Sequence, residues 1–340
     1  MKRFPAEWEL QSFVQIAWPH IETDWLPYLD DANKCYRNLT KEIAKREKLV
    51  IVTPDPAGVL DQLEMISELN RDNIDIVQIE TNDTWARDHA FITTIEDGTR
   101  VLNDFGFNGW GMKFAADLDN QISEKIFDRL EGEFSYRDQR RIILEGGSVE
   151  SDGKGTILTT SSCLLAPNRN YYTKAEAENM LKDNLHAERV LWLNHGYLAG
   201  DDTDGHIDTL ARLCPNDTIV YVQCKNRKDE HFAELRAMEE ELKSMKTAEG
   251  KLFRLLPLPM TDPIFDEDED DFRLPATYAN FLIMNGAVLM PTYGQTENDA
   301  KAKAVLAEAF PDREIVGVDC QVLIRQHGSL HCITMQYPKL

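Results

Sequence analysis

The chain has 340 residues, of which 42% are hydrophobic, and a formal net charge of −22. Nucleic acid is therefore a poor partner, because binding phosphates requires a basic surface. A small cationic molecule suits such a chain better through long-range steering, although solubility alone also accounts for the charge.

The apolar and N-terminal segments predict a cytoplasmic protein. No run of about 18 apolar residues indicates a membrane span. No apolar segment follows Lys2 and Arg3, as one does in a secretory signal. The six cysteines are scattered without a C-x-x-C motif, so a structural zinc site has no support and most are expected to be buried free thiols.

Apolar runs alternate with amphipathic segments along the chain, which predicts an α/β protein. The expected strands are residues 13–18, 49–53, 74–79, 142–144, 189–193, 218–223, 281–290 and 314–318. The expected helices are residues 32–45, 56–68, 118–130, 174–185, 229–245 and 297–310. Six consecutive acidic residues at 266–271 predict a solvated loop.

Four polar clusters each follow an apolar run, at residues 85–88, 145–147, 204–208 and 328–332. Asp88 and Glu145 are 57 positions apart, and Glu145 and His206 are 61 apart. His206 and Cys332 are 126 apart, about twice that interval. Such a period suggests modules that each contribute one loop to a shared centre.

Cys332 is the candidate nucleophile in these clusters. It follows Gly328 and Ser329 and precedes an apolar, strand-like segment, where a rigid element would hold a reactive thiol. The alternative is a buried core thiol, which is the usual state of a free cysteine.

His206 and Asp208 lie in a polar turn that contains two glycines. If Ile207 faces the core, both side chains point the same way. A carboxylate beside a histidine raises the pKa of the imidazole and fixes its orientation. An H-x-D pair can instead hold a divalent cation, but no H-E-x-x-H motif or cysteine-rich partner accompanies this one.

Two more carboxylates follow apolar runs. Asp88 ends a segment in which Trp85, Arg87 and an acid stand together. Glu145 precedes two glycines, whose missing side chains would let a ligand or another backbone approach. Glu145 could equally cap a turn or pair with Arg87.

Five segments taken together resemble the agmatine deiminase family, which lies in the guanidine-modifying superfamily alongside bacterial peptidylarginine deiminase-like proteins. They are PAEWE at 5–9, DTWARD at 83–88, LEGGS at 144–148, DTDGHID at 202–208 and GSLHCIT at 328–334. The likeness runs nearly end to end. It implies a single domain over residues 1–340, a pentein-type α/β-propeller of five pseudo-symmetric modules around a central active site.

The resemblance also implies a role for each matched residue. The family's nucleophile corresponds to Cys332 and its general acid/base to His206. The carboxylates that hold the substrate correspond to Asp88 and Asp208, and a supporting glutamate to Glu145. The implied reaction is hydrolysis of a guanidinium group to a urea, with no metal and no organic cofactor.

The chain departs from the family pattern at two positions. Ala90 and His327 stand where relatives often carry glycine. Neither change removes a chemical group, but both alter the fit around the substrate.

Agmatine, a small cationic guanidino compound, is the favoured substrate, which places the chain in putrescine biosynthesis. Peptidylarginine or free arginine and, less favoured, a non-catalytic propeller-fold binding protein are the alternatives. Trp85 and Asp204 are expected beside the substrate, with Asp202 or Asp204 facing the distal ammonium unless they cap the turn. Arg87 and Arg212 are the basic residues that could instead bind a substrate carboxylate. Assembly into a homo-oligomer is compatible with the sequence.

Overall fold

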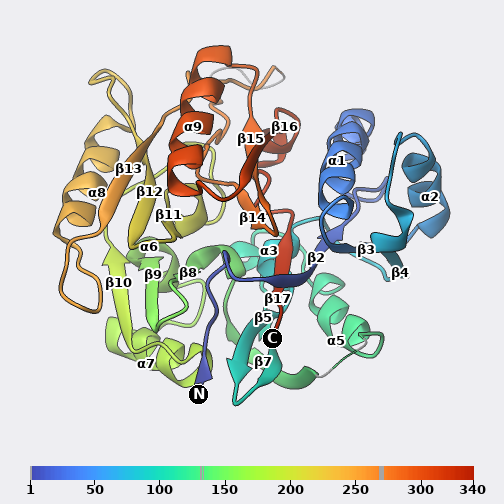
Figure 1. The fold of residues 1–340 in the computed structure, drawn as a ribbon, viewed down its shortest axis with the longest axis horizontal. Coiled ribbons are helices and arrows are strands. Elements are labelled where there is room, and N and C mark those ends of the chain that lie inside the picture. Colours follow the sequence, from blue (N-terminus) through green and yellow to red (C-terminus); the bar gives the residue numbers. More distant parts are fainter. Residues whose placement is uncertain (1, 131, 133, 268–271) are drawn as a thin grey trace.

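The computed structural model describes residues 2–130, 132, 134–267 and 272–340. Most of the acidic run at 266–271 lies outside the described residues. Within the described ranges the strands form five sheets, and the longer helices lie at the periphery (Figure 1). The prediction of a mixed α/β fold is confirmed.

The sheets use strands in the following orders. The first has β1 (Lys2–Arg3), β5 (Ile92–Glu96), β6 (Thr99–Gly106) and β7 (Phe134–Ile143). The second has β10 (Arg189–Leu193), β9 (Thr156–Thr160) and β8 (Val149–Ser151), and the third has β11 (Ala211–Cys214), β12 (Thr218–Gln223) and β13 (Arg254–Pro259). The fourth has β14 (Leu282–Met284), β15 (Ala287–Thr292) and β16 (Glu314–Asp319). The fifth has β17 (Met335–Pro338), β2 (Gln11–Ala17), β3 (Lys48–Thr53) and β4 (Ile74–Gln78).

The same pairing recurs in every sheet: a strand pairs antiparallel with one neighbour and parallel with the next. The recurring antiparallel pairs are β5–β6, β8–β9, β11–β12, β14–β15 and β17–β2. The recurring parallel pairs are β6–β7, β9–β10, β12–β13, β15–β16 and β2–β3. The two four-stranded sheets add an antiparallel pair, β1–β5, and a parallel pair, β3–β4. The fifth sheet joins the two ends of the chain, because Met335 lies opposite Gln15.

A helical segment makes each parallel connection, as a crossover between parallel strands requires. The five connecting helices are α5 (Ile122–Phe127), α7 (Lys174–Leu185), α8 (Phe232–Ser244), α9 (Thr296–Ala309) and α1 (Leu29–Ala44). A sixth helix, α2 (Pro56–Glu64), makes the parallel connection from β3 to β4. The other α-helices are α3 (Ala86–His89), α4 (Gly109–Met112) and α6 (Ser161–Leu164). Single 3₁₀ turns occur at Leu26–Tyr28, Arg71–Asn73, Asp119–Gln121, Gly146–Ser148, Ile207–Thr209 and Leu323–Gln326. None of the helices in the described ranges combines the length and apolar character that crossing a membrane requires.

Three predicted elements need correction. The strand expected at 281–290 is two strands, β14 and β15, because a turn at Gly286 (φ +73°) reverses the chain. The helix expected at 118–130 is a 3₁₀ turn followed by the shorter α5. The strand expected at 142–144 is the end of β7, whose first residues alternate between exposed and half-buried positions and include too many polar side chains to form an apolar run.

Candidate active site

Five loops meet at the candidate site, and each one leads into the first strand of an antiparallel pair. They are residues 85–88 before β5, 145–147 before β8, 206–208 before β11, 280 before β14 and 331–332 before β17. The loops contact one another directly: the Arg87 amide donates to the Cys332 carbonyl at 3.1 Å, and the Gly147 amide donates to Asp88 Oδ1 at 3.0 Å. Residues spread over most of the chain therefore form one centre.

Cys332 is held by Asn280. The Asn280 Oδ1 atom accepts hydrogen bonds from the amides of His331 at 2.8 Å and Cys332 at 3.3 Å. The Asn280 Nδ2 atom lies 3.2 Å from the sulfur. Burial, followed by the charges of Asp208 and Asp88, raises the pKa of the Cys332 thiol well above its ordinary value. The sulfur is thus a protonated thiol at neutral pH until those charges are balanced.

His206 is fully buried, and its Nδ1 atom lies 3.7 Å from Asp88 Oδ1. Burial opposes the charged imidazolium, but Asp88, then Cys163 and Glu145, outweigh it and raise the pKa of His206 well above its ordinary value. Neither ring nitrogen makes a hydrogen bond of ordinary geometry among the described residues, although a hydrogen-bonding contact with the Cys163 thiol contributes to the raised pKa. The raised pKa favours the protonated imidazole, which could donate a proton to a bound ligand.

Asp88 is fixed by two hydrogen bonds. The Trp110 indole donates to Oδ2 at 2.9 Å, and the Gly147 amide donates to Oδ1. The carboxylate is 3% exposed. Each carboxylate oxygen can accept a second hydrogen bond, so Asp88 retains acceptor capacity for a ligand.

Asp208 faces the same centre from the loop before β11. Its Oδ2 atom lies 2.7 Å from His331 Nδ1, and its Oδ1 atom has no partner among the described residues. Burial alone would raise the pKa of this carboxyl, but the hydrogen bond and charge of His331 lower it below the ordinary value. A buried carboxylate with one free oxygen is a binding point for a cationic N–H donor.

Glu145 is buried and pairs with Arg169, whose Nε atom lies 2.8 Å from Oε1. The prediction left open a pair with Arg87, and that pair does not form. The second oxygen, Oε2, has no partner among the described residues, and burial raises the pKa of this carboxyl. Arg169 also pairs with Asp204 at 2.7 Å.

Asp204 accordingly faces cations of the protein itself. It binds Lys113 at 2.9 Å as well as Arg169. Asp202, the other acid considered for the distal ammonium, lines the pocket that reaches Cys332. The prediction that Asp204 binds substrate gains no support from this geometry.

Gly147 lies between the reactive groups. A Cβ atom at this position would stand 2.5 Å from His206 Nδ1, 3.0 Å from Asp88 Oδ1 and 3.1 Å from Asp208 Oδ2. The three side chains therefore converge on one point, and only a residue without a side chain fits there. This is the close approach that the glycines after Glu145 predicted.

A narrow pocket leads from the surface to Cys332 and Asp88. Its wall contains the aromatic side chains Trp85, Trp110 and Phe114. Its acidic lining residues are Asp24, Asp83, Asp88 and Asp202. Trp85 is oriented by Asp83, which accepts from the indole nitrogen at 3.0 Å. Trp85 therefore forms part of the pocket wall, and its contact with a substrate stays a prediction.

The two basic residues singled out earlier are both paired with acids. Arg87 lies 3.2 Å from Glu7, and Arg212 lies 2.6 Å from Glu7 and also binds Glu150. Glu7 further contacts His331 Nε2 at 2.7 Å. Both arginines therefore brace the back of the catalytic loop rather than lining the pocket.

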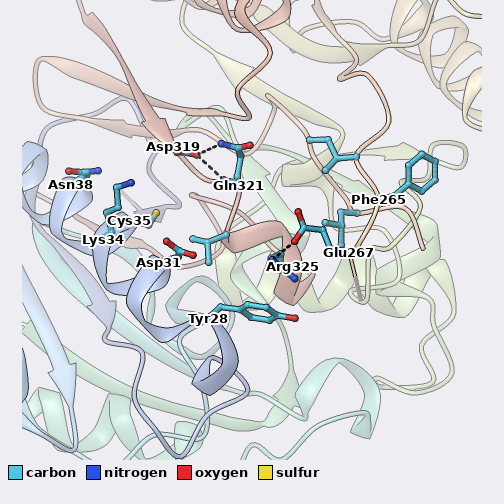
Figure 2. A pocket seen from close by; sticks show the side chains of 13 residues that line it. Tyr28, Asp31, Lys34, Cys35, Asn38, Phe265, Glu267, Asp319, Gln321 and Arg325 are labelled. Atoms are coloured by element: carbon cyan, nitrogen blue, oxygen red, sulfur yellow. Dashed lines mark hydrogen bonds and ion pairs between the residues drawn. The ribbon is translucent and has the colours of Figure 1, made fainter. Parts of the chain in front are cut away.

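A second, larger cavity of about 310 Å³ lies between α1, the loop around Phe265 and the segment from Asp319 to Arg325 (Figure 2). Its polar side chains are largely engaged, since Asp319 binds Gln321 and Arg325 pairs with Glu267. None of the predicted site residues lines it.

The arrangement defines a class of protein: a mixed α/β fold in which a buried cysteine, a buried histidine and two aspartates converge from three of the five sheets. Solved structures share this fold over the whole chain. One is a Porphyromonas gingivalis protein provisionally named an arginine deiminase, which is 47% identical, with a TM-score of 0.93 and coverage of 100% of this chain and 99% of the other. A cysteine-to-serine variant of the C. jejuni agmatine deiminase, solved with substrate bound, is 37% identical, with a TM-score of 0.91 and coverage of 100% and 97%.

The chain belongs to the Porphyromonas-type peptidyl-arginine deiminase family, whose family model matches residues 3–338. The agmatine deiminase of Pseudomonas putida is 32% identical over 98% of this chain and 95% of its own length. These findings confirm the resemblance drawn from the five segments, and with it the expected enzyme class, a hydrolase of amidine C–N bonds.

Proposed function

We propose that the protein hydrolyses agmatine to N-carbamoylputrescine and ammonia, with Cys332 as nucleophile. The observation that carries the proposal is the convergence of Asp88 and Asp208 beside Cys332 and His206. A guanidinium is planar and presents paired N–H donors, which two carboxylates bind in a fixed orientation. That orientation brings the central carbon to the thiol and makes the attack effectively unimolecular.

The substrate itself activates the nucleophile in this proposal. Burial, followed by the charges of Asp208 and Asp88, raises the pKa of the Cys332 thiol in the free protein. A bound guanidinium balances the two carboxylate charges, so the pKa of the thiol falls, its proton leaves to solvent, and the thiolate forms only when the substrate is in place. Asn280 Nδ2, 3.2 Å from the sulfur, donates to the thiolate and stabilises it.

His206 moves the remaining protons. The Cys332 thiolate adds to the guanidinium carbon, and the C–N bond breaks as protonated His206 gives its proton to the departing ammonia. The product is an amidino-thioether on Cys332. The now neutral imidazole takes a proton from water, and the hydroxide adds to the same carbon. The C–S bond then breaks and the hydroxyl proton leaves to solvent, which releases the urea and the Cys332 thiolate. His206 thus gives one proton to ammonia when the adduct forms and takes one proton from water when the adduct is hydrolysed.

The choice of agmatine rests on the pocket wall. Besides Asp88, three acids line it, Asp24, Asp83 and Asp202, and its only basic lining residue among the described ones is His327. The His327 Nδ1 atom lies 3.0 Å from the Gly200 carbonyl, so its ring is held by the backbone. This wall suits the distal ammonium of agmatine and repels the carboxylate of free arginine.

A second candidate is peptidylarginine, and the name of the family is the observation that favours it. A peptide would have to reach Cys332 past Trp85, Trp110 and Phe114. These aromatic side chains narrow the pocket around an extended alkyl chain, which favours the small substrate.

We also propose a five-bladed propeller with this site at its centre. The repeated pairing in the five sheets, and the closure of the fifth by β17 on β2, support that arrangement. We further propose that the reaction takes place in the cytoplasm and that its product leads to putrescine.

Steady-state kinetics with agmatine, free arginine and a blocked arginine peptide, measured side by side, test the proposed function. We expect kcat/KM for agmatine to exceed both others by at least about a hundredfold, roughly 2.7 kcal/mol. If the enzyme preferred the peptide or free arginine, the assignment of agmatine as substrate would be wrong, whereas the proposed guanidine hydrolysis would stand. If none of the three substrates gave a product in which the guanidinium has become a urea group, the proposal would be overturned. The Cys332→Ser variant serves as the blank in each assay.

A further inference from the structure

A second thiol lies beside the catalytic histidine and has no part in the reaction proposed above. Ligand atoms of Glu145, Cys163 and His206 all lie within 4.8 Å of one another, and all three residues are buried. We propose that these three residues form a binding site for a thiophilic divalent cation such as Zn²⁺, and that its occupancy switches the enzyme off.

The donors are free to bind. The Oε2 atom of Glu145 has no hydrogen-bond partner among the described residues, and neither ring nitrogen of His206 makes a hydrogen bond of ordinary geometry there. The Cys163 thiol is itself close enough to His206 to influence the pKa of the imidazole. Cys163 is a free, fully buried thiol. A thiolate, an imidazole and a carboxylate are a ligand set that zinc prefers, with a water as the fourth ligand.

The positions of the donors are fixed before any cation binds. The Cys163 amide donates to Thr160 Oγ1 at 3.4 Å, and the same hydroxyl donates to the Gly205 carbonyl at 2.7 Å. This bridge ties α6 to the loop that carries His206. Donor atoms around tetrahedral zinc lie about 3.3–3.8 Å apart, so side-chain movements of about 1 Å suffice to close the site.

The surrounding charges allow the cation and limit its affinity. Asp88 lies 3.7 Å from His206 and also lines the pocket. Its carboxylate therefore attracts a cation that enters the pocket from solvent towards the site. Arg169 opposes binding, because its charge lies against Glu145 Oε1 at 2.8 Å. His206 and Cys163 must each lose a proton before they can act as ligands, and the pKa of both groups is raised, so binding strengthens as pH rises.

The functional consequence rests on the proposed role of His206. Once one nitrogen of His206 ligates the cation, the positive charge of that cation disfavours a further positive charge on the ring. His206 then no longer carries the proton that the departing ammonia needs. Inhibition therefore arises next to the nucleophile without a bond to Cys332.

Direct binding tests the site independently of activity. In a Cys332→Ser background, Cd²⁺ titration should give a thiolate charge-transfer absorption that saturates at one ion per chain. Adding Cys163→Ser should abolish it, whereas adding Cys224→Ser, a buried cysteine outside the site, should leave it intact. Absorption that survives in the Cys332→Ser, Cys163→Ser double variant, or none in Cys332→Ser, would overturn the site. Because no turnover is involved, either result leaves the proposed function untouched.

Inhibition by Zn²⁺ tests the switch. The two variants are Cys163→Ser and Cys163→Ala, each with Cys332 intact. The melting temperature of each variant first confirms that it is folded. Its rate with Zn²⁺ is then compared with its own rate without Zn²⁺. We expect both variants to raise the half-inhibiting zinc concentration by at least about tenfold, roughly 1.4 kcal/mol. Equal sensitivity in wild type and variants would assign inhibition to Cys332 and refute the switch.

Discussion

Gly147→Ala adds one methyl group at the point where the reactive side chains converge. The new Cβ atom would stand 2.5 Å from His206 Nδ1, whereas ordinary contact begins near 3.4 Å. The imidazole must therefore move by about 0.9 Å, and Asp88 and Asp208 by a few tenths of an ångström each. A misplacement of about 1 Å in a catalytic group costs about a hundredfold in rate, or roughly 2.7 kcal/mol.

The assay is kcat/KM for agmatine together with the melting temperature of each variant. We expect Gly147→Ala to lose about a hundredfold in kcat/KM. Gly317→Ala is the matched control, because it also adds a tight contact, 3.0 Å to the end of the Thr292 side chain, but far from the site on β16. It should keep wild-type kinetics. A folded Gly147→Ala protein with wild-type kcat/KM would show that the three side chains do not work in the arrangement described here.

Three further predictions concern Cys332, the metal requirement, and the buried carboxyl of Asp119 outside the site. Cys332→Ser should lower kcat at least about a thousandfold and leave the fold intact, because a serine hydroxyl is a far weaker nucleophile at neutral pH; substantial residual turnover in the purified variant would place the nucleophile elsewhere. Activity should survive exhaustive chelation, and its loss, followed by recovery on adding one metal, would make the His206–Asp208 pair a ligand set. Burial raises the pKa of Asp119 from 3.8 to about 8. The folded protein therefore holds this proton more tightly than the unfolded chain, and the resulting contribution to the free energy of unfolding is complete below about pH 4 and is lost as the pH rises to about 8. Asp119→Asn should therefore gain stability over wild type across that window, by at least about 1 kcal/mol, and level off above it; a difference in urea unfolding that does not change with pH would contradict this.

Motif spacing located four of the five loops of the site. Cys332, His206, Asp88, Asp208 and Glu145 were predicted from the sequence, and the structure brings all five together, although their roles stay predictions until tested. The fifth loop could have been found from the doubled interval between His206 and Cys332. Asn280 stands inside it, 74 positions after His206 and 52 before Cys332.

Other contacts could not be predicted, because they depend on how distant loops pack. Trp110 binds Asp88 only because Gly109, Trp110 and Gly111 all adopt positive φ angles, and glycines on both sides of a tryptophan were the sole signal for it. The pairing of Asp204 with Lys113 joins segments 91 positions apart, and an acid in a motif does not reveal which cation it meets.

Regular structure was predictable where burial makes a strand apolar along its whole length or gives a helix a clear apolar face. The bounds of 174–185, 189–193 and 218–223 match the structure. Strands such as β1 and β8 were missed, because two or three residues carry no period, and their pairing depends on distant partners.

The central claim is that Cys332 bonds to the guanidinium carbon of agmatine. Mass spectrometry of the wild-type reaction, quenched in acid during turnover and digested, tests it most directly. The account predicts a mass of agmatine less ammonia on the peptide that contains Cys332, and none in Cys332→Ser. An adduct found only on another residue would contradict it.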